Sequence, residues 1–342
     1  MSFRGRYLSK IPELLRLAMP VALAQLGYIA VQVADTAMVG AFGSEDAVPL
    51  AAVSFGSTVA WVFTFLCMGL SIGLTPIIGE LFVQGEKQRM ANYLETSLLF
   101  YPVFGVMCMA LQIATEPLLY HLGQPVEVVD MAVPYYRLMA YSLPAIMLYG
   151  CFKQFLEGMG DTTTPMVIAI TTNLVNVALN WVFIYGHCGF EAMGVYGAGL
   201  ATLIARYISP VLIFIYFVVK GECRDYLKLF SRGVNYIKDT YHLLKIGVPT
   251  AGQMLLEGAA FVVTSVMMGW FGAEAIAANQ VAMTYGNAAF MLTIALGSAA
   301  TIRTSHCYGL RDKEQMRSVI VSSLHLAAFW GACVLVVFVL FR

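Results

Sequence analysis

Long apolar runs, separated by short polar connections, dominate this chain. Nine of them are long enough to cross a bilayer as a helix, which takes roughly 20 predominantly apolar residues. They fall at residues 17–39, 50–79, 96–115, 132–152, 164–186, 195–219, 242–270, 277–302 and 318–341. The long polar stretch 220–241 indicates a cytoplasmic linker with a surface helix. The pattern predicts an all-α polytopic membrane protein.

The first of these segments recurs, in the same orientation, 229 residues later. LLRLAMPVALAQ at Leu14–Gln25 corresponds to LLKIGVPTAGQM at Leu243–Met254. The first copy then has three extra residues, and the later matches are Thr75 with Thr301, Lys87 with Lys313 and Met90 with Met316. Such duplication is typical of transporters built from two halves around a cavity. We therefore predict a first lobe at 1–219, a linker at 220–241 and a partial second lobe at 242–342.

Composition narrows the class further. Hydrophobic residues make up 59% of the chain and charged residues 12%, about half the charge of a soluble domain. The net charge is zero, which disfavours nucleic acid as a partner. The sequence contains no P-loop, no HExxH motif and no Cys/His set with metal-ligand spacing. We expect no cofactor and no direct drive by ATP.

Lysine and arginine predict the orientation. With the N-terminus inside, 17 of the 20 basic residues fall in inner segments, beginning with Arg4, Arg6, Lys10 and Arg16 and including Arg232 in the linker. The outer connections carry acids instead, among them Glu45, Asp46, Glu116 and Glu274. This asymmetry follows the positive-inside rule. It predicts a multi-pass protein of the cell membrane, in a bacterium the inner membrane, with a cytoplasmic N-terminus.

Two carboxylates lie within predicted spans, where an ionisable group is costly unless it faces protein or water. The first is Asp35, which shares a helix face with Tyr28 and Gln32 at i, i+4, i+7 spacing. Counting from the outer ends of the helices places Asn180 and Thr202 at the depth of Asp35, with Asn176 one turn deeper. The four residues form a candidate cation-coupling site.

The chemistry of this set admits two ions. Carboxylate, amide and hydroxyl oxygens suit a small hard cation such as Na⁺, held by Asp35, Asn176 and Asn180. Burial also favours the neutral form of a carboxyl, which suits reversible protonation. Two alternatives remain open from the residues alone: the amides simply join helices, or Asp35 pairs with Arg206 in the sixth span.

The second carboxylate is Glu257, which has Gln253 one turn before it in the seventh span. Glu257 corresponds to Tyr28 in the first copy, so the two halves place their acids at different positions. We group Glu257 and Gln253 with Tyr28 and Gln32 as a candidate substrate cavity. Pro20 and Pro249 occupy equivalent places, and each removes a helix hydrogen bond. They are either static kinks or hinges.

Several motifs resemble the multidrug and toxic compound extrusion (MATE) family, and most closely its NorM-type branch. They are VADTAMVG (Val33–Gly40), EGMGDTTTP (Glu157–Pro165), NLVNVALNW (Asn173–Trp181), YGAGLAT (Tyr196–Thr202) and GVPTAGQMLLE (Gly247–Glu257). The resemblance implies a V-shaped fold of twelve helices in two pseudo-symmetric lobes. By position in these motifs, it implies roles in coupling for Asp35, Asn176, Asn180 and Glu257, and less firmly for Thr202.

The resemblance also implies export of organic, often cationic, drugs in exchange for Na⁺ or H⁺. It describes a protein that is not an enzyme and whose partners are small organic cations and the lipid bilayer; we expect a monomer. Only nine of the twelve helices are present, so we expect the second lobe to be incomplete after the ninth helix.

Two other functions compete with drug export. The first is flipping of lipid-linked saccharides, which tends to require several basic residues in the cavity, whereas Arg206 and Lys153 are the few near the membrane interior. The second is an intramembrane serine protease. Gly69-Leu-Ser71-Ile-Gly73 matches GxSxG, with His306 and His325 as candidate bases. That string lies in an apolar helix, without the strand–turn–helix context of a hydrolase.

Overall fold

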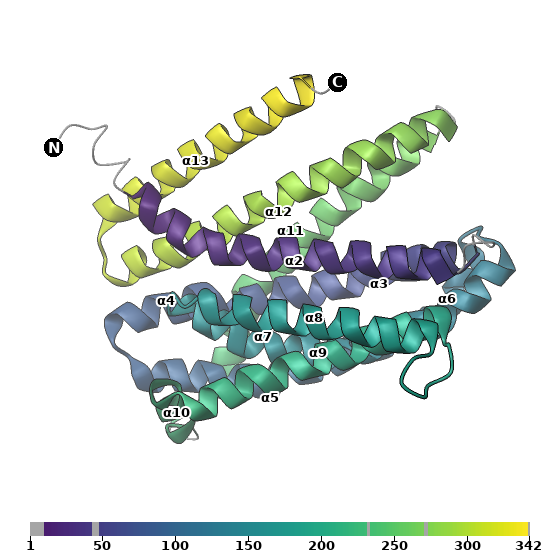
Figure 1. Cartoon of the computed structure of the whole chain (residues 1–342). Coiled ribbons are helices and arrows are strands. Elements are labelled where there is room, and N and C mark those ends of the chain that lie inside the picture. The colour runs from purple at the N-terminus through teal and green to yellow at the C-terminus, as the bar shows by residue number, and fades with distance from the viewer. Residues whose placement is uncertain (1–9, 43–47, 231–232, 270–272, 341–342) are drawn as a thin grey trace.

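The computed structural model describes residues 10–42, 48–230, 233–269 and 273–340, and this part contains helices and no strand (Figure 1). The helices are α2 (Ile11–Phe42), α3 (Val48–Ile72), α4 (Leu74–Gln84), α5 (Lys87–Ala114), the 3-10 helix η1 (Glu116–His121), α6 (Val126–Tyr141), α7 (Leu143–Gly158), α8 (Thr163–Tyr185), α9 (Gly194–Val219), α10 (Gly221–Lys228), α11 (Tyr236–Gly269), α12 (Ala273–Gly309) and α13 (Lys313–Leu340). The all-α prediction is confirmed. Arg4, Arg6, Arg232, Glu45 and Asp46 lie outside the described residues.

Six helical segments in the described part are long and apolar enough to cross a membrane. The single crossing predicted at 132–152 is wrong as one helix, because α6 ends at Tyr141 and α7 begins at Leu143. The break has local causes. The Ser142 hydroxyl donates to the Met139 carbonyl at 2.6 Å, and Pro144 in the first turn of α7 has no N–H to continue α6. The predicted surface helix of the linker is α10.

The break between α3 and α4 at Gly73 divides the second predicted crossing in a similar way. Pro76 lies in the first turn of α4 and cannot donate to a carbonyl of α3. The predicted crossing 277–302 falls within α12, and residues 242–269 of the crossing predicted at 242–270 fall within α11; both helices begin before the apolar runs.

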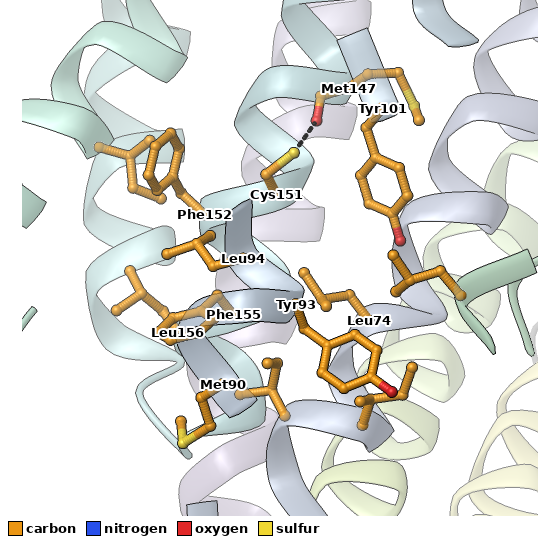
Figure 2. Close-up of a cluster of buried hydrophobic side chains, with 14 of the residues drawn as sticks. Leu74, Met90, Tyr93, Leu94, Tyr101, Met147, Cys151, Phe152, Phe155 and Leu156 are labelled. Atoms are coloured by element: carbon orange, nitrogen blue, oxygen red, sulfur yellow. Dashed lines mark hydrogen bonds between the residues drawn. The ribbon is translucent and has the colours of Figure 1, made fainter. Parts of the chain in front are cut away.

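The helices of the first half, α2 to α9, pack around two apolar clusters. The larger one joins α3, α4, α5 and α7, and Leu74, Tyr101, Met147 and Phe155 are buried in it (Figure 2). The Cys151 thiol lies among them and donates to the Met147 carbonyl at 3.3 Å. Burial of this apolar surface holds the first half together as one body.

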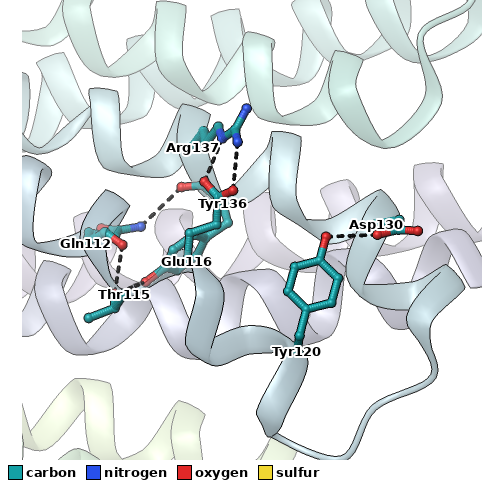
Figure 3. Close-up of polar contacts among 7 residues, drawn as sticks. All are labelled: Gln112, Thr115, Glu116, Tyr120, Asp130, Tyr136 and Arg137. Carbon is teal, nitrogen blue, oxygen red and sulfur yellow. Dashed lines mark hydrogen bonds and ion pairs between the residues drawn. The ribbon is translucent and has the colours of Figure 1, made fainter.

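A polar network fixes the connection between α5 and α6 through η1 (Figure 3). Arg137 donates twice to the Glu116 carboxylate, at 2.6 and 2.7 Å. The Tyr120 hydroxyl donates to Asp130 at 2.8 Å. The Arg137 guanidinium holds the pKa of the Glu116 carboxyl below its usual range. Arg137 is thereby neutralised within the first half.

The internal repeat is visible in the backbone at the ends of α4 and α12. Gly85 and Arg311, which are 226 residues apart, both adopt a left-handed conformation, with φ of 73° and 56°. The next amide closes the turn in each copy: Glu86 N–H donates to Leu81 C=O and Asp312 N–H to Cys307 C=O, both at 3.1 Å. We call the end of the molecule that carries these two turns the basic end.

These turns yield a prediction on stability. A left-handed conformation costs a residue with a Cβ roughly 1 kcal/mol more than glycine, and a Cβ at Gly85 would touch nothing within 4 Å. We expect Gly85→Ala to lower the free energy of unfolding by about 1 kcal/mol and Arg311→Gly to raise it by up to a similar amount. Thermal unfolding in detergent measures both. Gly221→Ala, at an equally open position with negative φ, is the control, and equal losses in Gly85→Ala and Gly221→Ala would contradict the argument.

Small residues let the two halves approach each other closely. A Cβ at Gly69 of α3 would lie 2.4 Å from Cα of Ala251 in α11, and one at Gly73 would lie 2.7 Å from Cα of Gly247. The repeat places Ala299 and Ala18 at the positions of Gly73 and Gly247, and both are buried in one cluster between α12 and α2. Two equivalent crossings therefore join the halves, at positions that flank Pro20 and Pro249.

Polar contacts close the basic end between the same halves. The His306 ring lies 2.8 Å from the Gly158 carbonyl, and the Tyr93 hydroxyl lies 2.8 Å from Nδ1 of His242. Arg303 forms an ion pair with Glu13 at 2.5 Å. Away from this end, α11 and α12 lean away from α3 to α9 (Figure 1). The halves thus meet at the basic end and diverge toward the opposite end.

Candidate functional site

The four polar residues predicted for cation coupling lie together between α2, α8 and α9. Asn180 Nδ2 donates to Asp35 Oδ1 and also to Asn176 Oδ1 at 3.1 Å. The Asn176 amide in turn lies 3.2 Å from the Thr202 hydroxyl. Asn176 and Asn180 are buried at 3% and 0% exposure, and Asp35 is half-buried. The structure brings the predicted set together, whereas its role in coupling stays a prediction.

The Asn176 amide fits this site in two orientations. In one, its oxygen accepts from Asn180 Nδ2 and its nitrogen donates to Thr202. In the other, its nitrogen donates to Asp35 Oδ1 at 3.1 Å and its oxygen accepts from Thr202. In the first orientation Asn180 Nδ2 donates to both Asn176 Oδ1 and Asp35 Oδ1, so one amide bridges the two oxygens.

One oxygen of the site has no hydrogen-bond partner among the described residues. Asn180 Oδ1 is buried and accepts no hydrogen bond from the described residues. A buried acceptor without a partner costs about 1–3 kcal/mol. Together with Asp35 and Asn176 it supplies three oxygens from two adjacent helices, which is chemistry that fits a small hard cation.

An apolar layer bounds the site on the side away from the basic end. One turn beyond Asp35, Asn180 and Thr202 stand Val39, Ile184 and Ala198 respectively. The exposed fractions of these three side chains are 0%, 0% and 1%, and all belong to one cluster. The layer separates the oxygens from that end of the helices.

Arg206 forms no ion pair with Asp35. Its guanidinium donates to the Ser142 hydroxyl at 2.6 Å, at the break between α6 and α7. Among the described residues Asp35 forms no ion pair within 4.0 Å. The alternative of an Asp35–Arg206 ion pair is therefore wrong.

A row of aromatic rings, which the sequence analysis missed, leads from this site toward Glu257. Tyr28 meets Trp61 edge to face with ring centroids 5.6 Å apart, and Trp61 lies 4.9 Å from Phe65. A Cβ on Gly258 would lie 3.2 Å from the Phe65 ring. The row crosses from α2 over α3 to α11. Rings four residues apart on one helix were its only signal in the sequence.

The structure also places the residues predicted for the substrate cavity and the two prolines predicted as kinks or hinges. Gln253 Nε2 donates to Glu257 Oε1 at 2.9 Å within α11. Gln32 is exposed. Pro20 and Pro249 lie inside the continuous helices α2 and α11. Membership of one substrate cavity, and hinge motion at the prolines, stay predictions.

The GxSxG string does not form a catalytic pair. The Ser71 hydroxyl donates to the Met68 carbonyl at 2.8 Å within α3. His306 contacts the Gly158 carbonyl, and His325 contacts Val321 C=O at 2.8 Å. In the described part of the chain neither histidine contacts Ser71, so the protease alternative has no structural basis.

Known proteins similar in sequence to this chain include multidrug resistance proteins. The multidrug resistance protein NorM of Photobacterium profundum is 30% identical over 314 residues, which are 90% of this chain and 66% of that protein. NorM of Vibrio cholerae is 27% identical over 311 residues, covering 90% of this chain and 67% of that protein. The chain thus spans about two thirds of the length of these relatives.

Solved structures match the fold. A MATE transporter of Vibrio cholerae superposes with a TM-score of 0.85 at 20% identity, over 98% of this chain and 75% of that one. The outward-facing conformation of a multidrug resistance MATE family transporter gives 0.83 at 22% identity, over 96% and 72%. The two-lobed fold is thereby confirmed, and this chain covers 75% and 72% of the two structures.

The family assignment rests on most of the chain. The sequence model of the MatE family matches residues 20–182 and 249–342, which include Asp35, both asparagines and Glu257. The match confirms the resemblance found in the motifs, and with it the classification as a transporter rather than an enzyme. The chain belongs to the MatE family of multidrug and toxic compound extrusion transporters.

Proposed function

We propose that the chain exports organic cations in exchange for Na⁺ or H⁺, with the coupling ion bound at Asp35. The observation that carries this proposal is the buried oxygen cluster. The Asp35 carboxylate has no basic partner among the described residues, and it lies beside Asn176 and Asn180. Asn180 Oδ1 accepts no hydrogen bond from a described residue. The relatives named as multidrug resistance proteins support the substrate class.

Exchange requires that ion and substrate favour different conformations. The two orientations of the Asn176 amide supply one local difference, because an ion at Asp35 selects the orientation that presents Oδ1. The row from Tyr28 through Trp61 to Phe65 supplies aromatic surfaces for an organic cation, which is attracted to ring faces. The ion thereby acts beside the place where the substrate binds.

The basic end lies in the cytoplasm in this proposal, and the N-terminus with it. Lys87, Arg303, Arg311 and Lys313 gather there, as expected for the cytoplasmic side of a bacterial inner membrane. The halves meet at this end, so the conformation described here is open toward the outside. The geometry of the coupling site given above is then that of the outward-open state in the transport cycle.

Transport by the purified chain in liposomes tests the proposal. Ethidium movement is followed under an imposed Na⁺ gradient at equal pH and, separately, under a pH gradient without Na⁺. We expect one of the two gradients to drive ethidium several-fold faster than no gradient. Rates that equal those of protein-free liposomes under both gradients would rule out coupled export by this chain.

A further inference from the structure

A pocket lies at the basic end, away from the Asp35 site. Its volume is about 540 Å³, within the roughly 300–1,000 Å³ of ordinary ligand pockets. One wall comes from α4 of the first half and the others from α11, α12 and the start of α13. Glu80, His242, Ile246, Thr304, Tyr308 and Met316 are the lining residues that matter here. The pocket therefore straddles the contact between the two halves.

Glu80 is the one acidic side chain among the described residues that line the pocket, which also include His242. Glu80 is half-buried in the wall from α4, and its side-chain contact is Gln84 Nε2 at 3.5 Å. Within the described residues Glu80 forms no ion pair, although other acids at this end do: Glu86 pairs with Arg89 at 2.8 Å and Glu13 with Arg303. The carboxylate thus faces the pocket with its charge unpaired.

The rest of the lining suits an organic molecule. Tyr308 is 62% exposed and offers its ring, while Ile246 and Met316 add an apolar, adaptable surface. A small metal ion prefers six or more oxygens around it, and one carboxylate beside a few hydroxyls falls short of that. One anion with aromatic and apolar walls matches an organic monocation.

The position of the pocket determines what a bound ligand does. Ile246 is adjacent to Gly247, which packs against Gly73 at the crossing of the halves. A molecule that contacts Glu80 in the first half and Tyr308 in the second bridges the contact. Because a ligand stabilises the state that binds it better, occupancy favours the conformation closed at the basic end.

We propose that this pocket binds one organic cation, recognised by Glu80, and that the bound cation holds the two halves together at the basic end. Its ligand class rests on the proposed function, whereas its geometry does not. At high concentration on that side, a transported cation would slow its own export, since the halves must part there to load the next molecule.

Equilibrium binding of tetraphenylphosphonium to the purified chain tests the site directly. We expect Glu80→Gln to weaken one class of binding at least tenfold, because a contact to a charged group is replaced by a neutral one. Glu86→Gln, which removes an acid at the same end that is already paired with Arg89, is the matched control. Equal binding by the wild-type chain, Glu80→Gln and Glu86→Gln would overturn the proposal.

Two further measurements separate this site from the coupling site. Cys307 is buried beside the crossing of α2 and α12, and tetraphenylphosphonium should slow its alkylation in the wild-type chain and not in Glu80→Gln. Unchanged alkylation in both would overturn the bridging role. Asp35→Asn should leave the Glu80-dependent binding and this protection intact. If Asp35→Asn lost tetraphenylphosphonium binding and the protection of Cys307, while Glu80→Gln kept both, the cation would be assigned to the coupling site instead.

Discussion

Replacing Asp35 with asparagine is expected to abolish ion-driven export while leaving the fold intact. Asparagine keeps an oxygen that accepts from Asn180 Nδ2, so the packing of α2 against α8 survives. The negative charge, however, is lost from a cluster that holds no second carboxylate among the described residues. A bond to a charged group contributes roughly 1.5–3 kcal/mol, so cation binding should weaken roughly 10–100-fold.

Ethidium transport in liposomes measures the effect, and thermal unfolding shows whether the variant is folded. Asp130→Asn is the matched control, since Asp130 is an exposed acid in α6 that bonds only Tyr120 among the described residues. It should transport at the wild-type rate. Wild-type transport by Asp35→Asn would remove Asp35 from the coupling step and leave Glu257 as the other candidate acid predicted from the sequence.

Replacing Gly69 with valine is expected to force the two halves apart at the basic end. A Cβ at Gly69 would lie 2.4 Å from Cα and 2.9 Å from N of Ala251. Backbone atoms cannot rotate out of the way as a side chain can, so α3 and α11 must separate. Overpacking costs about 1–3 kcal/mol, which changes the ratio of closed to open conformations roughly 5–150-fold.

Alkylation of Cys307, located by mass spectrometry, reports this opening. The thiol is 3% exposed between α12 and its neighbours, so it should react much faster in Gly69→Val than in the wild-type chain. Gly252→Val is the control, because Gly252 follows Ala251 on α11 and a Cβ there meets nothing within 4 Å. Equal Cys307 reactivity in the two variants would show that the crossing does not hold the basic end closed.

The sequence predicted the helical class, the repeat and the composition of the Asp35 cluster, because these depend on local periodicity. Asp35, Asn180 and Thr202 could be matched by counting turns from the helix ends. Asparagines one turn apart necessarily share a face. The depth argument needed no knowledge of which helices touch.

The remainder depended on contacts that periodicity does not encode. The breaks at Gly73 and Ser142 interrupt apolar runs that hydropathy treats as continuous. The engagement of Arg206 by Ser142 joins residues 64 positions apart, and the sequence alone left Arg206 as a partner for Asp35. The pocket at Glu80 requires the packing of two halves, which no pattern within one segment reveals.

The repeat has a consequence for how charge is distributed along the pathway. The position of Asp35 is occupied by Thr264 in the second copy, and the position of Glu257 by Tyr28 in the first. Seven residues of helix span about 10 Å. If the two copies are overlaid, the acids stand at different levels, with Glu257 nearer the basic end. Duplication has therefore left a symmetric scaffold with staggered charges, and under the proposed function a cation would meet the two acids in succession.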